Sequence, residues 1–330
     1  MKYAKDTRPK GASTKAAEVL VEALPWIKNI TGKTVVIKYG GSAMVDGRLR
    51  ADVMNDIVLL KIVGVNPVIV HGGGKAITEA MDFVQLPVEF RDGQRVTTPE
   101  AMDLVRTVLM GKVNQELVEA LNEHGNFAVG VSGADAGVIV AEQASPDLGR
   151  VGRITRINSP LINDLVAGDY IPVIASVALG EDGGFYNVNA DMVAGHIAAA
   201  IGAHKVVFLT DVDGLYENFE NKDSLISNLT LFEAQYMVEN NIVSTGMIPK
   251  LKSCIHALDA GVFRAHIING ITPHSLLLEL LTSTGVGTTM HSTEESCAFD
   301  THPLGNFASK LLENRQHSIA AGTGLNGKTF

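Results

Sequence analysis

Residues 33–75, KTVVIKYGGSAMVDGRLRADVMNDIVLLKIVGVNPVIVHGGGK, carry the pattern that decides the fold. An apolar, β-branched run over residues 33–39 is followed by two glycines, by a helical stretch that ends near Gly64, and by a second apolar run over residues 67–70. This order of strand, glycine turn, helix and strand is typical of a βαβ unit. The stretch therefore predicts an α/β fold.

The same alternation continues along the chain. Thr98 suits an N-cap and Pro99 suits the first position of a long helix that reaches about Glu123. Further apolar runs predict strands at residues 127–131, 171–175, 206–209 and 266–268. Strands that alternate with helices predict an open, mainly parallel, twisted sheet sandwiched by helices.

Four segments follow from composition and periodicity. Apolar residues recur at helical spacing from Ser13 to Leu24, which predicts an amphipathic N-terminal helix extension that ends before Pro25. The turn-rich run over residues 179–186, LGEDGGFY, predicts a boundary between two lobes near Ser176. Beyond residue 290 the chain is rich in Ser, Thr, Gly and Asn without a period. The predicted segments are an N-terminal tail and helix (1–29), two lobes (30–176 and 177–290) and a poorly ordered C-terminal tail (291–330).

Composition excludes several classes of protein. The net charge of −9 argues against a broad nucleic-acid surface, which needs clustered Lys and Arg. The two cysteines, Cys254 and Cys297, lack metal-binding spacing and predict neither a disulfide nor a structural zinc site. Every apolar run is interrupted well before about 18 residues, so no membrane partner is expected. We therefore predict a cytoplasmic location.

Candidate functional residues follow three of the predicted strands. These loops are residues 38–41 (KYGG), 71–75 (HGGGK) and 210–214 (TDVDG). Ligands of open α/β sheets collect at the carboxyl ends of strands, where glycine turns and helix N-termini direct amide groups at phosphates. One glycine pair alone would indicate only a tight turn, but two such loops, each beside a lysine, favour a phosphate site.

Several familiar nucleotide motifs are absent from these loops. No G-x-x-x-x-G-K-[ST] loop and no H-R-D or D-F-G set occurs, and G-x-G-x-x-G does not follow the first strand. The missing dinucleotide fingerprint argues against an oxidoreductase. A single histidine at a strand end is more often a hydrogen-bonded structural residue than a catalytic base, so we assign His71 no proton transfer.

Six short motifs in order resemble the amino acid kinase family. They are residues 36–41 (VIKYGG), 70–74 (VHGGG), 93–97 (GQRVT), 187–191 (NVNAD), 246–250 (GMIPK) and 273–279 (PHSLLLE). The resemblance extends from about Ile30 to Met290 and is strongest to the branch that acts on N-acetyl-L-glutamate. It implies ATP-dependent phosphorylation of the side-chain carboxylate of N-acetyl-L-glutamate, giving N-acetyl-L-glutamyl 5-phosphate, in arginine biosynthesis. Residues 30–176 would then bind the acceptor and residues 177–290 the nucleotide.

The resemblance also implies a catalytic group. Lys38 and Lys250 would flank the transferring phosphoryl group, Asp191 would hold the two ammonium groups, and Gly41 would direct an amide at the phosphate. Taken singly, each lysine would be a solvated surface residue and Asp191 a carboxylate in the first turn of a helix. An ionised carboxylate acceptor needs no general base.

Ligand-binding residues are implied in the same way. The guanidinium fork of Arg95 suits a carboxylate, although a single arginine is often just a surface ion pair. The implied substrate-binding residues are Gly73, Gly74, Arg95 and Asn187. The implied nucleotide-binding residues are Gly40, Gly41, Asp211, Gly214, Met247 and Lys250. Mg²⁺ would accompany ATP, with nucleotide phosphates and water as its main ligands and no dedicated protein site.

Regulation is implied by the resemblance to an arginine-inhibited branch of the family. In that branch an N-terminal helix joins dimers into hexamers, so we expect a homo-oligomer, either a dimer or a hexamer. L-Arginine would be a feedback inhibitor that binds near Trp26, His274, Ser275, Glu279 and Gly285, with Glu279 pairing its guanidinium. From the pattern alone, a helix packed on its own subunit is an equal alternative.

Two other functions stay open. A different member of the family would phosphorylate glutamate, aspartate, carbamate, an aminoadipate derivative or uridylate. A catalytically silent nucleotide sensor would keep the fold without the reaction, but the presence of Lys38, Asp191 and Lys250 argues against it.

Overall fold

The structure is a computed structural model of the chain. It describes residues 10–41, 44, 46–91, 93–283 and 285–292. The predicted C-terminal tail and Cys297 therefore lie outside the described residues, except for His291 and Ser292.

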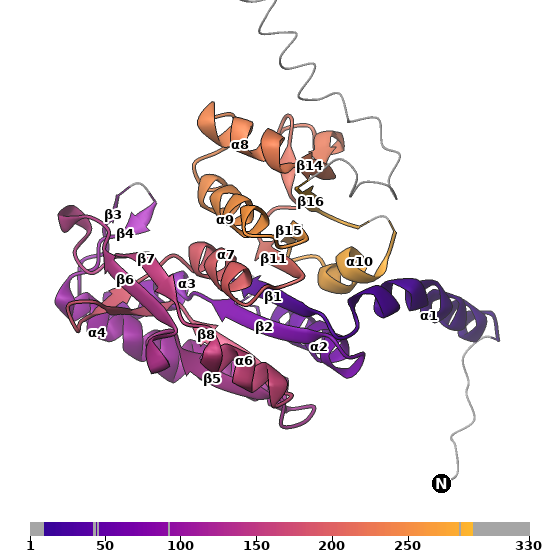
Figure 1. The fold of residues 1–330 in the computed structure, drawn as a ribbon, viewed down its shortest axis with the longest axis horizontal. Helices are drawn as coiled ribbons and strands as arrows, with labels where there is room; N and C mark the ends of the chain where they lie inside the picture. The colour runs from indigo at the N-terminus through magenta and orange to yellow at the C-terminus, as the bar shows by residue number, and fades with distance from the viewer. Residues whose placement is uncertain (1–9, 42–43, 45, 92, 284, 293–330) are drawn as a thin grey trace, which may run out of the picture.

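An eight-stranded sheet forms the centre of the molecule (Figure 1). Neighbouring strands pair in parallel, except for the antiparallel pair β15–β16. The predicted α/β fold with a mainly parallel sheet is confirmed. In spatial order the strands are β14 (Asn228–Thr230), β16 (Thr288–His291), β15 (Arg264–Asn269), β11 (Lys205–Thr210), β1 (Thr34–Tyr39), β2 (Asn66–His71), β8 (Ile171–Ala175) and β5 (Ala128–Ser132).

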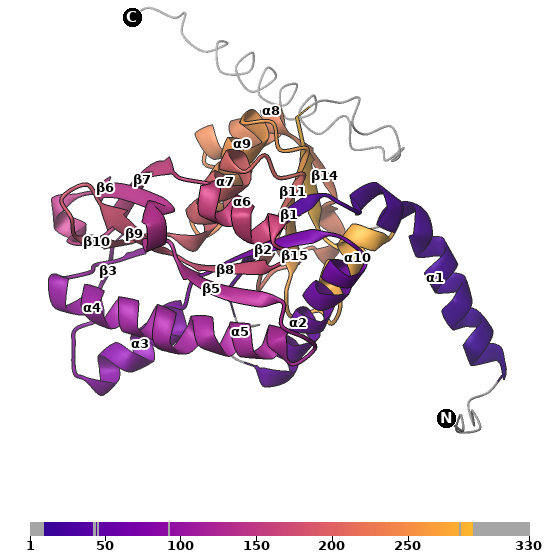
Figure 2. The same ribbon diagram turned by 60° about the horizontal axis from the view of Figure 1, so that its bottom comes forward.

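Helices cover both faces of this sheet, because successive side chains of a strand point to opposite sides. In β1, Val35 and Ile37 join one hydrophobic cluster, whereas Val36 joins the other. Figure 2 shows the helices on the two sides of the sheet. One side carries α2 (Gly47–Ile62), α3 (Gly74–Phe83), α4 (Pro99–Val108), α5 (Gln115–Asn122) and α10 (Ser275–Leu281), and the other carries α6 (Pro160–Ala167), α7 (Ala190–Ala200), α8 (Leu231–Glu239) and α9 (Ile248–Asp259).

The long helix predicted from Pro99 to about Glu123 is present but is not uniform. Thr98 caps α4 by accepting a hydrogen bond from the Ala101 amide, with Pro99 at the first helical position, as predicted. A π-helical segment, Leu109–Asn114, separates α4 from α5. We call it the π segment below.

The N-terminal helix is confirmed, but its predicted end at Leu24 is wrong. Helix α1 (Lys10–Ile30) continues through Pro25 and projects from the body of the molecule beside α10 (Figure 2). Its last turns stay helical because Trp26, Ile27 and Ile30 pack against the core. This packing offsets the free energy that is lost because Pro25 cannot donate a backbone hydrogen bond within the helix.

Shorter strands surround the predicted lobe boundary. A four-stranded sheet has the order β10-β9-β6-β7, so it takes strands from both sides of Ser176. Two small hairpins complete the described strands. These elements are β6 (Ile139–Gln143), β7 (Gly152–Ile157), β9 (Val177–Gly180), β10 (Phe185–Asn187), the hairpin β3 (Phe90–Arg91) with β4 (Gln94–Arg95), the hairpin β12 (Leu215–Tyr216) with β13 (Leu225–Ile226), and single 3-10 turns at Asp135–Gly137, Pro146–Leu148 and Lys222–Ser224.

The described residues include one of the two cysteines and all of the helices named above. Cys254 is a free, buried thiol. None of the described helices combines the length and the apolar character needed to cross a bilayer.

Candidate active site

The three loops singled out in the sequence meet at one edge of the central sheet. Strand β1 lies between β2 and β11, and Lys38 pairs in register with Val70 on one side and with Phe208 on the other. Parallel strands that end in register bring their following loops together. Gly41 has a φ of +79°, and a Cβ atom there would collide with the Asp211 carboxylate. The first glycine loop and the aspartate after β11 are thus in direct contact.

Asp191 lies between the two predicted lysines. Its carboxylate oxygens are 2.9 Å from the Lys38 ammonium group and 3.1 Å from the Lys250 ammonium group. Lys38 comes from the end of β1, Asp191 from the first turn of α7 and Lys250 from the first turn of α9. Three separate elements therefore build one charged group, which we call the ion triad.

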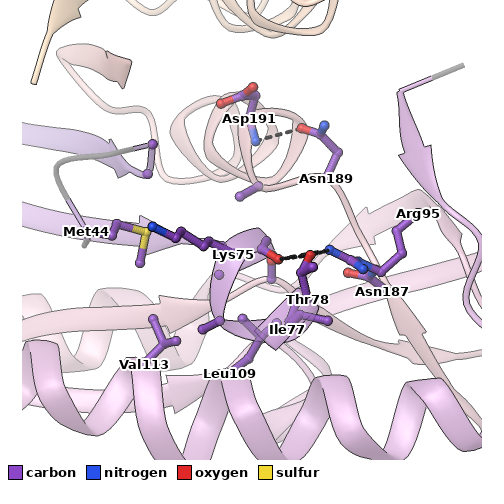
Figure 3. Close-up of a pocket in the computed structure, with 18 of the residues that line it drawn as sticks. Met44, Lys75, Ile77, Thr78, Arg95, Leu109, Val113, Asn187, Asn189 and Asp191 are labelled. Atoms are coloured by element: carbon purple, nitrogen blue, oxygen red, sulfur yellow. Dashed lines mark hydrogen bonds between the residues drawn. The ribbon is translucent and has the colours of Figure 1, made fainter. Parts of the chain in front are cut away.

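The local sequence explains how Asp191 is held. Asn189 is the N-cap of α7, and its side chain accepts a hydrogen bond from the Asp191 amide at 2.8 Å (Figure 3). It accepts a second hydrogen bond from the Met192 amide at 3.2 Å. Burial alone would raise the pKa of the Asp191 carboxyl, but Lys38 and Lys250 outweigh it and hold the pKa below its ordinary value. The triad thus has a carboxylate that is ionised at neutral pH and two cations fixed beside it.

A pocket of about 820 Å³ opens beside the triad. Lys38 and Asp191 border it, together with the glycine residues 40–41 and 72–74. In Figure 3, Leu109 and Val113 point toward the pocket from the long helix below. A pocket with an apolar floor, amide-rich loops and paired charges suits a small anionic ligand.

Arg95 and Asn187 line the same pocket. Arg95 is 7% exposed, and its guanidinium donates to the Gly74 carbonyl at 2.9 Å and to the Thr78 hydroxyl at 2.6 Å. It also stacks over the Phe90 ring at 4.7 Å. Among the described residues no carboxylate forms an ion pair with Arg95, so this buried cation is not the surface ion pair of the alternative interpretation.

The predicted nucleotide-binding residues are only partly brought together. Gly40, Gly41 and Asp211 line the pocket, whereas Gly214, Met247 and Lys250 do not. Gly214 packs against the Thr288 hydroxyl, which would collide with a Cβ atom, so its position has a structural reason. Met247 is 9% exposed just before α9.

The predicted regulatory residues lie around α10 and α1, away from this pocket. Trp26 is half-buried in α1, and His274 adopts a left-handed conformation just before α10. Its Nδ1 atom lies 2.6 Å from the Asp56 carboxylate. Ser275 is buried at the start of α10.

Glu279 is buried in an internal hydrogen-bond network. Its carboxylate accepts from the Val286 and Gly287 amides and the Thr289 hydroxyl, and lies 2.7 Å from the His266 ring. Gly285 is adjacent, with a φ of +60° and no room for a Cβ atom beside that carboxylate. Burial raises the pKa of Glu279, but the hydrogen bonds and His266 outweigh it and lower the pKa to about 2.

Three further residues of the site were not singled out in the sequence. Thr78 binds Arg95, Asn189 caps the helix of Asp191, and Asn114 in the π segment contacts His71 beneath the second glycine loop. The sequence could have indicated the N-cap, because asparagine is a favoured capping residue and Asn189 lies two residues before Asp191. The contact of Asn114 joins residues far apart in the chain and leaves no local signal.

Comparison with known proteins agrees with this geometry. A family model described as "Amino acid kinase family" matches residues 33–269. Acetylglutamate kinase of Caldanaerobacter subterraneus subsp. tengcongensis is 52% identical over 274 residues, covering 82% of this chain and 92% of that protein. Acetylglutamate kinase of Halothermothrix orenii is 49% identical over 277 residues, covering 82% of this chain and 96% of that protein.

Solved structures show the same fold at lower identity. N-acetylglutamate synthase from Neisseria gonorrhoeae, complexed with coenzyme A and N-acetyl-glutamate, is 23% identical with a TM-score of 0.73, covering 84% of this chain and 63% of that one. Carbamate kinase from Giardia lamblia, bound to citric acid, is 15% identical with a TM-score of 0.60, and the match covers 79% of this chain and 99% of that one. The family model and the relatives near 50% identity are decisive: this chain belongs to the amino acid kinase family.

Proposed function

We propose that this chain transfers the γ-phosphoryl group of ATP to the side-chain carboxylate of N-acetyl-L-glutamate, a step of arginine biosynthesis. The observation that carries the proposal is the ion triad beside a pocket that also holds a buried, fork-shaped Arg95. The relatives near 50% identity, which are acetylglutamate kinases, support this choice of acceptor over glutamate, aspartate, carbamate or uridylate.

The triad accounts for catalysis through charge. Phosphoryl transfer spreads negative charge over the equatorial oxygens of the phosphoryl group. Lys38 and Lys250 supply two fixed cations for that charge, and Asp191 keeps them in place and limits their repulsion. The amides of Gly41 and Gly74 add dipoles at the glycine loops.

The acceptor end of the pocket accounts for binding. Arg95 and Asn187 bind the acceptor, Arg95 by pairing its fork with a carboxylate, and Gly73 approaches it through the backbone. The attacking carboxylate is ionised at pH 7, so the reaction needs positioning rather than proton removal. Gly40, Asp211, Gly214 and Met247 serve the nucleotide side.

Mg²⁺ would accompany the nucleotide. The described residues contain no group of three His, Cys, Asp or Glu side chains that could hold a metal ion. At the pocket, Asp191 is paired with lysines and Glu116 with Arg50. This donor set fits an ion held mainly by phosphate oxygens and water. When bound, Mg²⁺ neutralises charge on the β- and γ-phosphates.

The test is a hydroxylamine trap for the acyl phosphate, run with Mg-ATP and each candidate acceptor. We expect hydroxamate with N-acetyl-L-glutamate alone, and its loss in Lys38→Ala and Lys250→Ala. Lys252→Ala is the matched control, because this exposed lysine lies two residues from Lys250 on the same helix. Hydroxamate with another acceptor would reassign the substrate, and no turnover with any acceptor would indicate a silent sensor.

Regulation and assembly are part of the proposal. We infer inhibition by L-arginine at the α1–α10 region and assembly into a dimer or hexamer, with a cytoplasmic location. Exposed apolar residues of α1, such as Leu20 at 68% and Leu24 at 57%, support a role for this helix in contacts between subunits. Sedimentation tests the assembly, and hydroxamate formation with and without L-arginine tests the inhibition.

A further inference from the structure

The π segment presses against the second glycine loop. A Cβ atom at Gly73 would lie 2.7 Å from Leu109 Cδ2 and 3.2 Å from Val113 Cγ2, so the loop backbone is packed directly on this helix. The extra residue of a π turn also lets two adjacent residues, Val113 and Asn114, face inward, with exposures of 6% and 0%. One of these two buried residues is polar, and its contacts are specific.

Asn114 donates both hydrogens of its side-chain amide. Its Nδ2 atom lies 2.8 Å from the Val173 carbonyl oxygen and 2.9 Å from Nε2 of His71. A backbone carbonyl can only accept, so the Val173 contact fixes which end of the amide is the nitrogen. The Oδ1 atom of Asn114 is buried without a donor among the described residues, facing Gly130. The two hydrogens that the Asn114 amide donates, and not its oxygen, therefore make the hydrogen bonds of this side chain.

The donated hydrogen determines the tautomer of His71. Because Nε2 accepts from Asn114, the single proton of the neutral ring sits on Nδ1. Nδ1 lies 2.9 Å from the Gly72 carbonyl oxygen and donates to it. His71 is 0% exposed, and burial lowers its pKa to about 4, so the ring is neutral at pH 7.

The Gly72 carbonyl in turn orients the next amide. In a trans peptide the carbonyl of one residue and the N–H of the next point in opposite directions within one plane. With the Gly72 oxygen held against His71, the Gly73 N–H points away from His71. Gly72 and Gly73 both line the pocket, and the Gly73 amide has no acceptor among the described residues.

We propose that Val173, Asn114 and His71 form a positioning relay that aims the Gly73 amide at an anionic oxygen of the reacting groups. This inference rests on the proposed function for the identity of those groups. None of the three relay residues is a catalytic residue, because each acts through its neighbour. A correctly aimed amide stabilises charge that develops during transfer, so loss of the relay lowers kcat more than it changes KM.

The decisive variant is Asn114→Asp, which keeps the shape and removes both donor hydrogens. Its carboxylate accepts from Nε2, so the His71 proton moves there and Nδ1 loses the hydrogen that held Gly72. We expect kcat to fall at least about tenfold, with KM for both substrates changing less than about threefold. Asn122→Asp is the matched control. It lies on α5 and contacts the backbone at residues 127–128 but not His71.

The tautomer is measured independently of turnover. In the full-length protein labelled with ¹⁵N-histidine, the ring nitrogens of His71 should report a proton on Nδ1, and in Asn114→Asp a proton on Nε2. If Asn114→Asp does not fold, Gly130→Ala replaces it, because the added methyl group would collide with Asn114 Oδ1 and push the amide off His71.

Three results would overturn the relay. They are a proton on Nε2 of His71 in the wild type, a kcat within about twofold of wild type in a folded variant, and an equal loss in Asn122→Asp. Failure of the proposed function looks different. In that case the wild type itself gives no hydroxamate with N-acetyl-L-glutamate, and the tautomer measurement still decides whether the relay exists.

Discussion

The Asp191 carboxylate lies 2.9 Å from the Lys38 ammonium group, with 7% of the aspartate side chain exposed. Lys250 approaches the same carboxylate from α9. Two cations this close repel each other, and little water is present to screen them. The carboxylate is therefore what allows both cations to stay beside the pocket.

Replacing this carboxylate tests the triad. Asp191→Asn keeps the shape but leaves two cations facing a neutral amide, so we expect kcat to fall by about 100-fold or more. Hydroxamate formation measures the rate. Asp103→Asn, at an exposed position of α4, is the control and should keep wild-type activity. Activity of Asp191→Asn within about threefold of wild type would contradict a role for the charge.

Arg95→Lys tests acceptor recognition. The change keeps a positive charge but loses the fork and the stacking on Phe90, so we expect KM for N-acetyl-L-glutamate to rise about tenfold or more. KM for ATP should change little. Arg91→Lys is the control, since Arg91 is an exposed residue of the same hairpin, paired with Glu89. Equal KM values in Arg95→Lys and wild type would exclude Arg95 from acceptor binding.

Glu279→Gln tests the network under α10. An amide nitrogen would replace one carboxylate oxygen. It would either oppose the backbone amides of Val286 and Gly287, which can only donate, or remove the charged acceptor of the Thr289 hydroxyl and the His266 ring. We expect a loss of about 2–4 kcal/mol in the free energy of unfolding, measured by urea denaturation. The control Glu239→Gln, exposed at the end of α8, should change it by less than about 0.5 kcal/mol. A loss no larger than this control would contradict the importance of the network.

The pair Asp56–His274 predicts a pH dependence. Its hydrogen bond and charge raise the pKa of His274, and burial raises the pKa of Asp56 to about 6. In both cases the folded state binds its proton more tightly than the unfolded state, so this contribution to stability falls as pH rises. The stabilisation from His274 is fully present below about pH 6.5, the pKa of a histidine in the unfolded chain. It is lost as the pH rises past the higher pKa of His274 in the folded protein.

The pH dependence is measured by comparing the melting temperatures of wild type and His274→Gln between about pH 6 and about pH 8.5. We expect the advantage of the wild type to be greatest near pH 6 and to shrink by about pH 8.5. The buried histidines with lowered pKa values, such as His71 and His266, are common to both proteins and cancel in the difference. An advantage that grows with pH would contradict the assigned sign.

The middle of the central sheet could be predicted because its strands there are mostly apolar, whereas the polar edge strands β14 and β16 were not predicted. Strands β1, β2, β8 and β11 are buried on both faces, so each forms a run that stands out from the sequence. Strand β10 has three residues and β3 has two, too few for a period to be seen. The end of α1 was misplaced because the cost of Pro25 is local, whereas the packing of Trp26 that offsets it is tertiary.

The candidate site, like the sheet, was predictable only in part. Residues that follow parallel strands share an edge, so the order of the motifs placed Lys38, the glycine loops and Asp211 together. The family resemblance implies that Gly214 binds the nucleotide, although its contact with Thr288 gives this glycine a structural reason. The relay residue Asn114 could not be found, because a polar residue in a long helix usually faces solvent.

The position of β1 in the sheet has a consequence for biosynthesis of the protein. Lys38 is held on one side by β2, which is made soon after it, but its other neighbour is Phe208 of β11, and Lys250 comes later still. Pairing between such distant segments is slow and cannot precede translation of the later one. A growing chain can therefore build the part of the pocket around Arg95 while the ion triad does not yet exist. A nascent or truncated chain is thus expected to be inactive even where its first half is folded.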